Sequence, residues 1–488
     1  MVSTDSLRGS YPATLAIALF ALIPYLLVSS AGSLLEGQIQ HDLEASRAAL
    51  GWAGSLSTAG YAFGALFAGD LVQRHPRRRL LPLLALATCA GWLCAAIAQG
   101  PVAYVAGHVL AGLTTGMLLV VSLPPVITGF SEKVTISAGF ISLGLFGAIA
   151  AGPMVGGLVA AGPGWRGFHL ALAAIALSVA GFSRVVLRDN DPPNPELPRD
   201  YGALVLAFLG TVLPFSAVAL LAGRSFGSAW FLVPLGIGLA CFAGIFLYEE
   251  RRQTPLVPIH KTIHTLPIIG TLIAAFAGGV FLSLLELSVG RTMQLWQFTP
   301  LKTGLTFSPL LLGAALAALI LARLFRSRYL PVLILVGLVM MIGSGIMLIA
   351  LASSSPWPWL SLALTLLGFG AGATVSPALF LAAFSLRSSL LPRVFAFIEL
   401  VRSVGDFLMG PILRQYAATL AAPEPLTDHA VALSMAIALA VGVIGTIVCT
   451  VLFRAAFRRL PVPQVDTWLE EEDAVAIQSP DIFPDHRQ

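Results

Sequence analysis

Long apolar runs separated by short polar connections follow one another along most of the chain. A helix needs about 20 mostly apolar residues to cross the hydrocarbon core of a bilayer. Only 11% of the residues are charged and 57% are hydrophobic, whereas globular domains carry about 25% charged residues. We therefore predict an all-α integral membrane protein with 14 transmembrane helices, at 12–35, 48–68, 80–98, 102–127, 135–160, 168–187, 202–222, 228–248, 266–290, 303–322, 329–352, 358–381, 394–416 and 430–453.

Basic residues gather in every second connection between these runs. Arg74, Arg77 and Arg78 follow the second run and Arg326 and Arg328 follow the tenth, whereas the alternate connections hold few basic residues. Excess positive charge in short loops marks the cytoplasmic side of a membrane. Because the alternation continues along the chain, we predict a multi-pass protein of the bacterial inner membrane type, with both termini cytoplasmic.

Two connections rich in proline and charge divide the chain. They are residues 188–201 and 249–265, which we predict to be cytoplasmic linkers. The predicted domains are an N-terminal six-helix bundle at 12–187, an inserted helix pair at 202–248 and a C-terminal six-helix bundle at 266–456. A basic loop recurs weakly in both halves, and repeated halves around a central site are common in secondary transporters.

The two ends of the chain are polar. Residues 1–11 precede the first span and form a short cytoplasmic N-terminus. Residues 457–488 follow the last span and include the acidic stretch Glu470–Asp473. Because low hydrophobicity with clustered charge favours disorder, we predict a disordered cytoplasmic tail.

The sequence lacks the motifs of zinc sites, of disulfide frameworks and of ATP-driven transport. The four cysteines lie inside apolar runs and have neither zinc nor disulfide spacing. No G-x-x-x-x-G-K-[ST] phosphate loop occurs, so the chain itself does not use ATP. A net charge of +4 needs no nucleic-acid partner. We expect no catalytic residues, no metal, no cofactor and no nucleic acid.

The predicted fifth span is unusually rich in glycine. Gly139, Gly152, Gly156 and Gly157 leave one side of it bare, so a second helix can approach at backbone distance. Pro153 removes an amide donor and bends or loosens the helix. A tight static helix pair and a moving, gating helix both fit this pattern.

Five short motifs occur in order along residues 12–455. They are Gly69–Leu81, Gly152–Gly157, Gly164-Trp165-Arg166, Leu301-Lys302-Thr303-Gly304 with Gln294 and Pro309, and Leu400–Gly405. In this order they resemble the major facilitator superfamily, and within it the fourteen-span drug:H+ antiporter (multidrug efflux) group. The resemblance implies the major facilitator fold, in which two six-helix bundles alternate access to a central site.

The resemblance also implies roles for two segments. In the family, the loop after the second span latches the inner gate, and its residues here are Gly69, Asp70, Arg74, Arg77 and Arg78. The glycine-proline end of the fifth span resembles the family's antiporter motif. This favours a helix that bends and seals during the alternation of access.

The chain departs from the family at the positions that usually handle the proton. Val28 and Gln73 stand where the family carries acids, Pro76 and Ala148 where it carries glycine, and His108 where it carries arginine. The resemblance therefore implies the fold without the usual coupling residues of the N-terminal half. His108 is a candidate coupling or substrate residue, and is either a hydrogen-bonded core residue or a group that titrates near neutrality.

Few other ionisable side chains lie in the spans, where each costs about 2.5–3.5 kcal/mol on insertion scales. Glu286 and Arg291 lie in the outer half of the ninth span. Glu399, Arg402 and Asp406 share one face of the thirteenth, at spacings of three and four residues. All five are candidates for coupling or substrate binding. The last three form either a self-neutralising structural triad or a titratable cluster facing a cavity, and only Arg402 matches a family motif.

Three functional classes follow. The first is a secondary active transporter that exports amphipathic drug-like or metabolite compounds by alternating access, linked to protons. The second keeps the fold without the coupling, as a facilitator or as an exporter of a lipid, siderophore or pigment. The third, a polytopic membrane enzyme or receptor, lacks the clustered His, Asp, Glu or Ser side chains that an enzyme needs. We expect a monomer in the lipid bilayer, not an enzyme, with a small-molecule substrate and the proton as a candidate partner.

Overall fold

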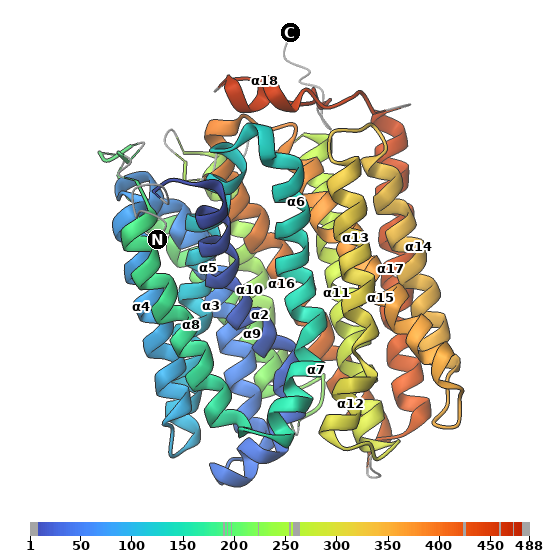
Figure 1. The fold of residues 1–488 in the computed structure, drawn as a ribbon. Helices are drawn as coiled ribbons and strands as arrows, with labels where there is room; N and C mark the ends of the chain where they lie inside the picture. The colour runs from blue at the N-terminus through green and yellow to red at the C-terminus, as the bar shows by residue number, and fades with distance from the viewer. Residues whose placement is uncertain are drawn as a thin grey trace, which may run out of the picture.

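The computed structural model describes residues 8–188, 191–192, 194–196, 198–222, 224–252, 255–256, 264–422, 426–457, 460–471 and 473–480. Every element within these residues is a helix, and the long helices run side by side through the molecule (Figure 1). The all-α prediction is confirmed for this part of the chain. Much of the predicted linker 249–265 and the end of the tail lie outside the described residues.

The helices fall into three groups along the chain. The first group is α2 (Tyr11–Asp42), α3 (Arg47–Arg74), α4 (Arg77–Ala96), α5 (Pro101–Thr128), the short η1 (Ser131–Lys133), α6 (Val134–Ser142), the π-helical η2 (Leu143–Gly147), α7 (Ala148–Ala161) and α8 (Gly164–Val186). The second is α9 (Tyr201–Leu220) and α10 (Ala229–Glu250). The third is α11 (Thr265–Gln294), α12 (Pro300–Thr306), α13 (Pro309–Leu324), α14 (Leu330–Ala350), α15 (Trp357–Ala383), η4 (Ser388–Leu390), α16 (Leu391–Ala421) and α17 (Asp428–Ala456), followed by the short α18 (Val465–Glu470).

Local sequence signals set several helix starts. The side chains of Ser46, Thr299 and Thr427 accept hydrogen bonds from backbone N–H groups three residues later, at 3.1, 3.2 and 3.3 Å. Such caps satisfy amide groups that have no partner within the helix. Proline occupies the first helical position of α5 and α13, where its missing N–H costs nothing.

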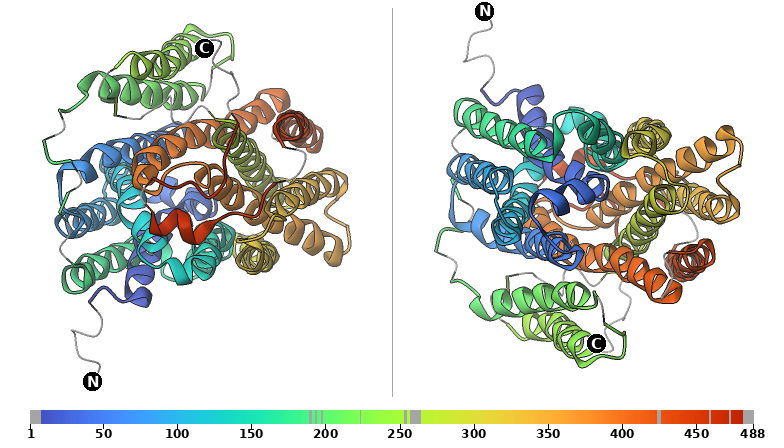
Figure 2. Two further views of the ribbon diagram at one scale, coloured as in Figure 1. Left: turned by 90° about the horizontal axis from the view of Figure 1, so that it is seen from above. Right: turned by 90° about the horizontal axis from the view of Figure 1, so that it is seen from below.

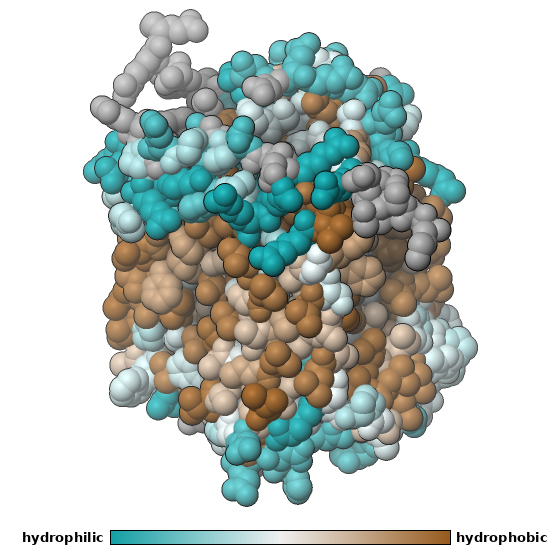
Figure 3. Space-filling view, turned by 60° about the vertical axis from the view of Figure 1, so that its left-hand side comes forward, coloured by the Kyte–Doolittle hydropathy of each residue, from teal (hydrophilic) through white to brown (hydrophobic). Residues whose placement is uncertain are grey.

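Within the described residues, 12 helical segments are long and apolar enough to cross a bilayer. All fourteen predicted runs are helical, but α3 and α16 do not meet this criterion although they have 28 and 31 residues. α16 carries three charged side chains close together, and α3 is rich in glycine, serine and threonine. On the face shown in Figure 3, an apolar band crosses the middle of the molecule between two polar ends.

The first and third groups form two bundles that lie against each other (Figure 2). The second group, α9 and α10, lies outside both (Figure 2). α9 packs into the seam between the bundles, because Ala203 and Ala207 join a buried cluster with Leu66 of α3 and Leu400 of α16. Only 17% of the most apolar stretch of α10 is buried, against 50% for α9, so α10 is the peripheral helix.

The tail differs from the disorder predicted for it. Residues 460–471 and 473–480 lie across one end of the molecule, where α18 forms (Figure 1). Val465, Trp468 and Ile477 are buried, at 2%, 0% and 2% exposure. The acidic residues lower the mean hydropathy of the tail, so composition alone favours disorder. Burial of the apolar side chains orders the segment.

Candidate functional site

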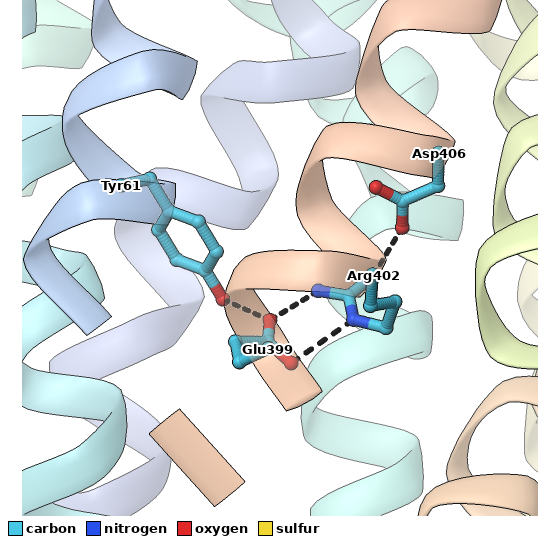
Figure 4. A network of polar contacts seen from close by, with 4 residues as sticks. All are labelled: Tyr61, Glu399, Arg402 and Asp406. Atoms are coloured by element: carbon cyan, nitrogen blue, oxygen red, sulfur yellow. Dashed lines mark hydrogen bonds and ion pairs between the residues drawn. The ribbon is translucent and has the colours of Figure 1, made fainter. Parts of the chain in front are cut away.

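Three charged side chains on α16 form a buried network. Arg402 donates from Nε to Oε2 of Glu399 at 3.0 Å, and its two other nitrogens bond to Oε1 of Glu399 and Oδ2 of Asp406 (Figure 4). The exposed fractions are 2% for Glu399, 8% for Arg402 and 1% for Asp406. The structure therefore brings together three of the six predicted coupling residues, with the arginine between two carboxylates.

A tyrosine from the other bundle completes this network. Tyr61 of α3 donates its hydroxyl proton to Oε1 of Glu399 at 3.2 Å (Figure 4). Tyr25 of α2 stacks on Tyr61 with ring centroids 5.3 Å apart, and Ser57 donates to the Tyr25 hydroxyl at 3.2 Å. We call Tyr61, Glu399, Arg402 and Asp406 the charged network. It joins the two bundles near the middle of the helices.

The charged network is not self-neutralising when its carboxyl groups are ionised. One guanidinium faces two carboxylates, so the ionised set carries one net negative charge. Within the described residues, Oδ1 of Asp406 has no hydrogen-bond partner. Gly278 of α11 packs against the carboxylate of Asp406, since a Cβ at position 278 would lie 2.7 Å from Oδ2 of Asp406. A net charge in such surroundings is costly, and one added proton removes it.

Glu286 and Arg291 do not join the charged network. Arg291 donates to Oδ1 of Asp428 at 2.7 Å and to the carbonyl of Leu348 at 2.8 Å, which ties α11 to α17 and α14. The carboxylate of Glu286 lies beside α16 at Gly410, where a Cβ would be 3.2 Å from Oε2. Arg291 thus connects three helices. Glu286 places a second carboxylate at the contact between α11 and α16, beside Gly410, which follows Asp406 by four residues.

His108 has a partner that the sequence did not indicate. Its Nε2 lies 3.1 Å from Nε2 of His169 on α8, and Nδ1 of His169 lies 2.6 Å from the carbonyl of Trp165. If Nδ1 of His169 donates to that carbonyl, Nε2 of His169 accepts from His108, and both rings are neutral. Trp92 and Tyr104 enclose the pair. His169 falls at the predicted start of a span, so its position in the sequence does not mark it as a buried residue.

The histidine pair offers too few ligands for a metal. Within the residues that the structure describes, no group of three or more His, Cys, Asp and Glu side chains could hold a metal ion. The pair therefore joins α5 to α8 inside one bundle and is separate from the charged network.

The basic loop after α3 is tied to the linker that follows α8. Asp70, which is 1% exposed, forms an ion pair with Arg74 and lies 3.8 Å from Nε of Arg199. Gln73, at the position of the family's loop acid, accepts a hydrogen bond from the Asn194 amide at 2.9 Å. A Cβ on Gly69 would lie 3.0 Å from Cβ of Ala396 on α16, so α3 contacts the other bundle here. Asp70 is thus the local partner of the loop, and Arg77 and Arg78 lie at the start of α4.

The glycines of the fifth span serve two different contacts. Gly152 and Gly156 face α2 of the same bundle, where added Cβ atoms would lie 2.8 Å from the carbonyl oxygens of Leu27 and Ala31. Gly139 and Gly157 instead face the other bundle, at α13 and α12. Pro153 lies inside α7, and the π-helical turn η2 precedes it. The glycines therefore allow close packing on two sides of the segment, whereas the sequence led us to expect one bare side.

Comparisons with known proteins place the chain among transporters. The family model described as Major Facilitator Superfamily matches residues 16–410. The tetracenomycin C resistance and export protein of Streptomyces glaucescens is 26% identical over 65% of this chain and 60% of its own length. The multidrug export protein EmrB of Haemophilus influenzae is 24% identical over 64% of this chain and 61% of its own length. The chain thus spans about three fifths of these relatives.

Solved structures agree on the fold. The human organic anion transporter MFSD10 superposes with a TM-score of 0.63 at 16% identity, over 92% of this chain and 100% of that chain. The POT family transporter PepTSo superposes with a TM-score of 0.61 at 15% identity, over 91% of this chain and 97% of that chain. At such identities the likeness concerns the arrangement of the helices alone.

Proposed function

Because this chain belongs to the Major Facilitator Superfamily, a family of transporters, we propose that it is a secondary active exporter of amphipathic drug-like or metabolite compounds. Export is linked to proton entry and proceeds by alternating access. In this mechanism two bundles rock about a central site, which opens to one side of the membrane at a time.

The charged network is the observation that carries the proposal. It lies inside the molecule, is almost completely shielded from water, and bonds α16 of one bundle to α3 of the other. Buried charges within membrane proteins are expensive and mark substrate or ion pathways. A network that spans both bundles must rearrange when they rock, so its protonation state and the conformation are coupled.

Asp406 is the proposed proton site. Its Oδ1 has no hydrogen-bond partner among the described residues, and Arg402 binds the other oxygen. A proton on Oδ1 neutralises the network and removes the net charge from an apolar surrounding. One proton that moves inward through 100 mV supplies about 2.3 kcal/mol, so one or two protons sustain a useful substrate gradient.

The proposed topology has 14 spans with both termini in the cytoplasm. α3 and α16 complete the count, because each is of spanning length and lies between helices that are apolar enough to span. Their polar residues are buried against other helices, as Asp70 and the charged network are. The arginine-rich connections and the tail then share the cytoplasmic side, in agreement with the excess of positive charge there.

The relatives support the direction and the kind of substrate. The names of these relatives describe export of tetracenomycin C and of multiple drugs. We propose that this chain likewise exports organic compounds, and that it acts as a monomer.

The test is transport by the purified protein in proteoliposomes under an imposed pH gradient, with a panel of lipophilic dyes as probes. We expect dye movement in the wild type to follow the gradient and to stop when an ionophore collapses it. Asp406→Asn should lower gradient-driven transport by at least about tenfold, because a neutral amide cannot cycle a proton. Glu44→Gln is the matched control, since Glu44 is exposed, and it should transport as the wild type does.

A proton-independent facilitator is the second candidate. It is favoured by the neutral side chains at Val28 and Gln73, since Gln73 binds Asn194 where the family has an acid. In that case dye should move equally with and without the gradient, and Asp406→Asn should be tolerated. That result would refute the coupling but leave the transporter assignment in place.

A further inference from the structure

The tail crosses the end of the molecule that carries the arginine-rich loops. We use the word tail for residues 460–471 and 473–480, which include α18 (Figures 1 and 2). It starts beyond α17 and returns to the N-terminus of α11. There Thr265 donates from its backbone N–H and from its hydroxyl to the carbonyl of Pro480, at 3.1 and 2.7 Å. Both ends of the tail are therefore fixed to the C-terminal bundle.

Trp468 anchors the middle of the tail. It is completely buried, and its Nε1 donates to the carbonyl of Leu386 at 2.6 Å. Its ring meets Phe384 edge-on with centroids 5.6 Å apart, and Phe384 in turn packs on Phe325 at 5.3 Å. A buried tryptophan with its N–H satisfied is a strong and specific anchor. This anchor also lies in the C-terminal bundle.

One arginine connects the anchored tail to the other bundle. Arg326, between α13 and α14, pairs with Asp466 of α18 at 2.7 Å. The same guanidinium donates to the carbonyl of Ser131 in η1 at 3.1 Å, and α18 itself packs against η1. η1 joins α5 to α6 and so belongs to the N-terminal bundle. The guanidinium of Arg326 therefore bonds to the tail at Asp466 and to the N-terminal bundle at Ser131.

We propose that the tail is a clasp that holds the two bundles together at this end, and that η1 must leave it before this end opens. The proposal rests on the alternating access of the proposed function. When the bundles separate here, η1 moves away from Arg326 and from α18. These contacts exist only in the closed state, so weakening them shifts the equilibrium toward the open one.

Trp468 matters more to the clasp than the ion pairs do. Asp466 is 63% and Asp473 84% exposed at the side chain, and exposed pairs contribute little. Asp473 pairs with Arg387, which follows α15, at 2.6 Å. The two acids orient Arg326 and Arg387, whereas the buried indole supplies the apolar contact. We therefore expect Trp468→Ala to loosen the clasp more than Asp466→Asn.

The experiment measures the separation of the bundles directly in the full-length protein. Spin labels are attached at Glu132→Cys in η1 and Arg328→Cys beyond α13, in a chain whose four natural cysteines are replaced by serine. Pulsed electron paramagnetic resonance gives the distribution of distances between the two labels in nanodiscs, with no substrate and no gradient. We expect Trp468→Ala to raise the population of the longer distance by at least about threefold, and Asp466→Asn by a smaller factor.

Two matched controls leave the clasp intact. Glu470→Gln removes an exposed acid from the same short helix, and Trp359→Ala removes an exposed tryptophan from α15. Both should keep the wild-type distribution. A chain that ends at Pro461 lacks the clasp altogether, so its distribution should shift at least as far as that of Trp468→Ala. An unchanged distribution in this truncated chain overturns the proposal.

Failure of the clasp is distinguishable from failure of alternating access. If low pH or added dye changes the distance in the wild type but tail variants do not, the bundles move and the tail does not hold them. If no condition and no variant changes the distance, the rocking motion is refuted, and the clasp with it.

Discussion

Arg402 is the residue on which the charged network depends. It satisfies two carboxylates at once, and neither carboxylate has another basic partner at salt-bridge distance among the described residues. Removing one partner of a buried ion pair leaves an uncompensated charge, whereas neutral groups of similar shape are tolerated. The cost of losing Arg402 thus arises mainly from what happens to Glu399 and Asp406.

Arg402→Met should destabilise the protein by about 3–5 kcal/mol unless the carboxylates take up protons, because two buried charges lose their counter-ion. The triple variant Glu399→Gln, Arg402→Met, Asp406→Asn should recover most of this loss, since it buries no charge. Thermal unfolding of the purified proteins in detergent measures both effects. Equal melting temperatures for the single and the triple variant would contradict this account of the network.

At the scale of the helices, the segment α6–η2–α7 differs from its neighbours. It contacts its own bundle through Gly152 and Gly156 and the other bundle through Gly139 and Gly157. The π-helical turn η2 shifts the helical register between Gly139 of α6 and the three glycines of α7. Pro153 is the irregularity expected from the sequence, and η2 is a second one.

The contact of α7 with α12 depends on two glycines. A Cβ on Gly157 would lie 2.6 Å from the carbonyl oxygen of Pro300 and 3.0 Å from Cα of Gly304, which are backbone atoms. Gly157→Ala should therefore separate the helices and destabilise the protein by about 1–3 kcal/mol. Gly37→Ala is the control, because no atom lies within 4 Å of its added Cβ. It should leave the melting temperature unchanged or raise it slightly, and a comparable fall in both variants would contradict the glycine contact.

At the scale of the whole molecule, the bundles touch at both ends. Gly69 meets Ala396 and Gly139 meets Ala322 at the end that carries the tail, and Gly157 meets Gly304 at the opposite end. The charged network lies between these contacts and is shielded from water. The structure therefore corresponds to a closed arrangement, and in the proposed alternating access one end must separate to admit a substrate.

The proposed topology predicts the side of each loop. Single cysteines at Glu44 and His429 should react with a membrane-impermeant maleimide in intact cells, because these positions lie at the outer ends of α3 and α17. Cysteines at His75 and Ser388 should react only after the cells are permeabilised. The pairs Glu44 with His75 and Ser388 with His429 bracket α3 and α16. If both members of a pair reacted in intact cells, that helix would not cross the membrane.

Helix positions were largely predictable, because most of the long helices contain a long apolar run and the family motifs fall in order along the chain. The spacing of Glu399, Arg402 and Asp406 also placed them on one face of a helix, as observed. Sequence spacing fixes neighbours within a helix, so these contacts were accessible without coordinates.

Contacts between distant helices were not predictable. Tyr61 and Glu399 are 338 positions apart, and nothing in the run around Tyr61 sets it apart from other aromatic residues. The pairing of His108 with His169 likewise depends on how α5 and α8 lie together. The contacts of the tail were inaccessible for the same reason, since Trp468 packs on Phe384 and bonds to Leu386, which lie more than 80 positions away.

The position of α9 and α10 has a consequence for molecules dissolved in the lipid. Because α9 fills the seam between α3 and α16, that flank is covered by the pair α9 and α10. The opposite flank, where α6 and α7 meet α12 and α13, has no such cover among the described helices, and its contacts rest on glycine. The two flanks therefore differ toward the bilayer, and an amphipathic compound of the proposed kind that enters from a leaflet would meet the flank at α6 and α7 without a covering helix pair.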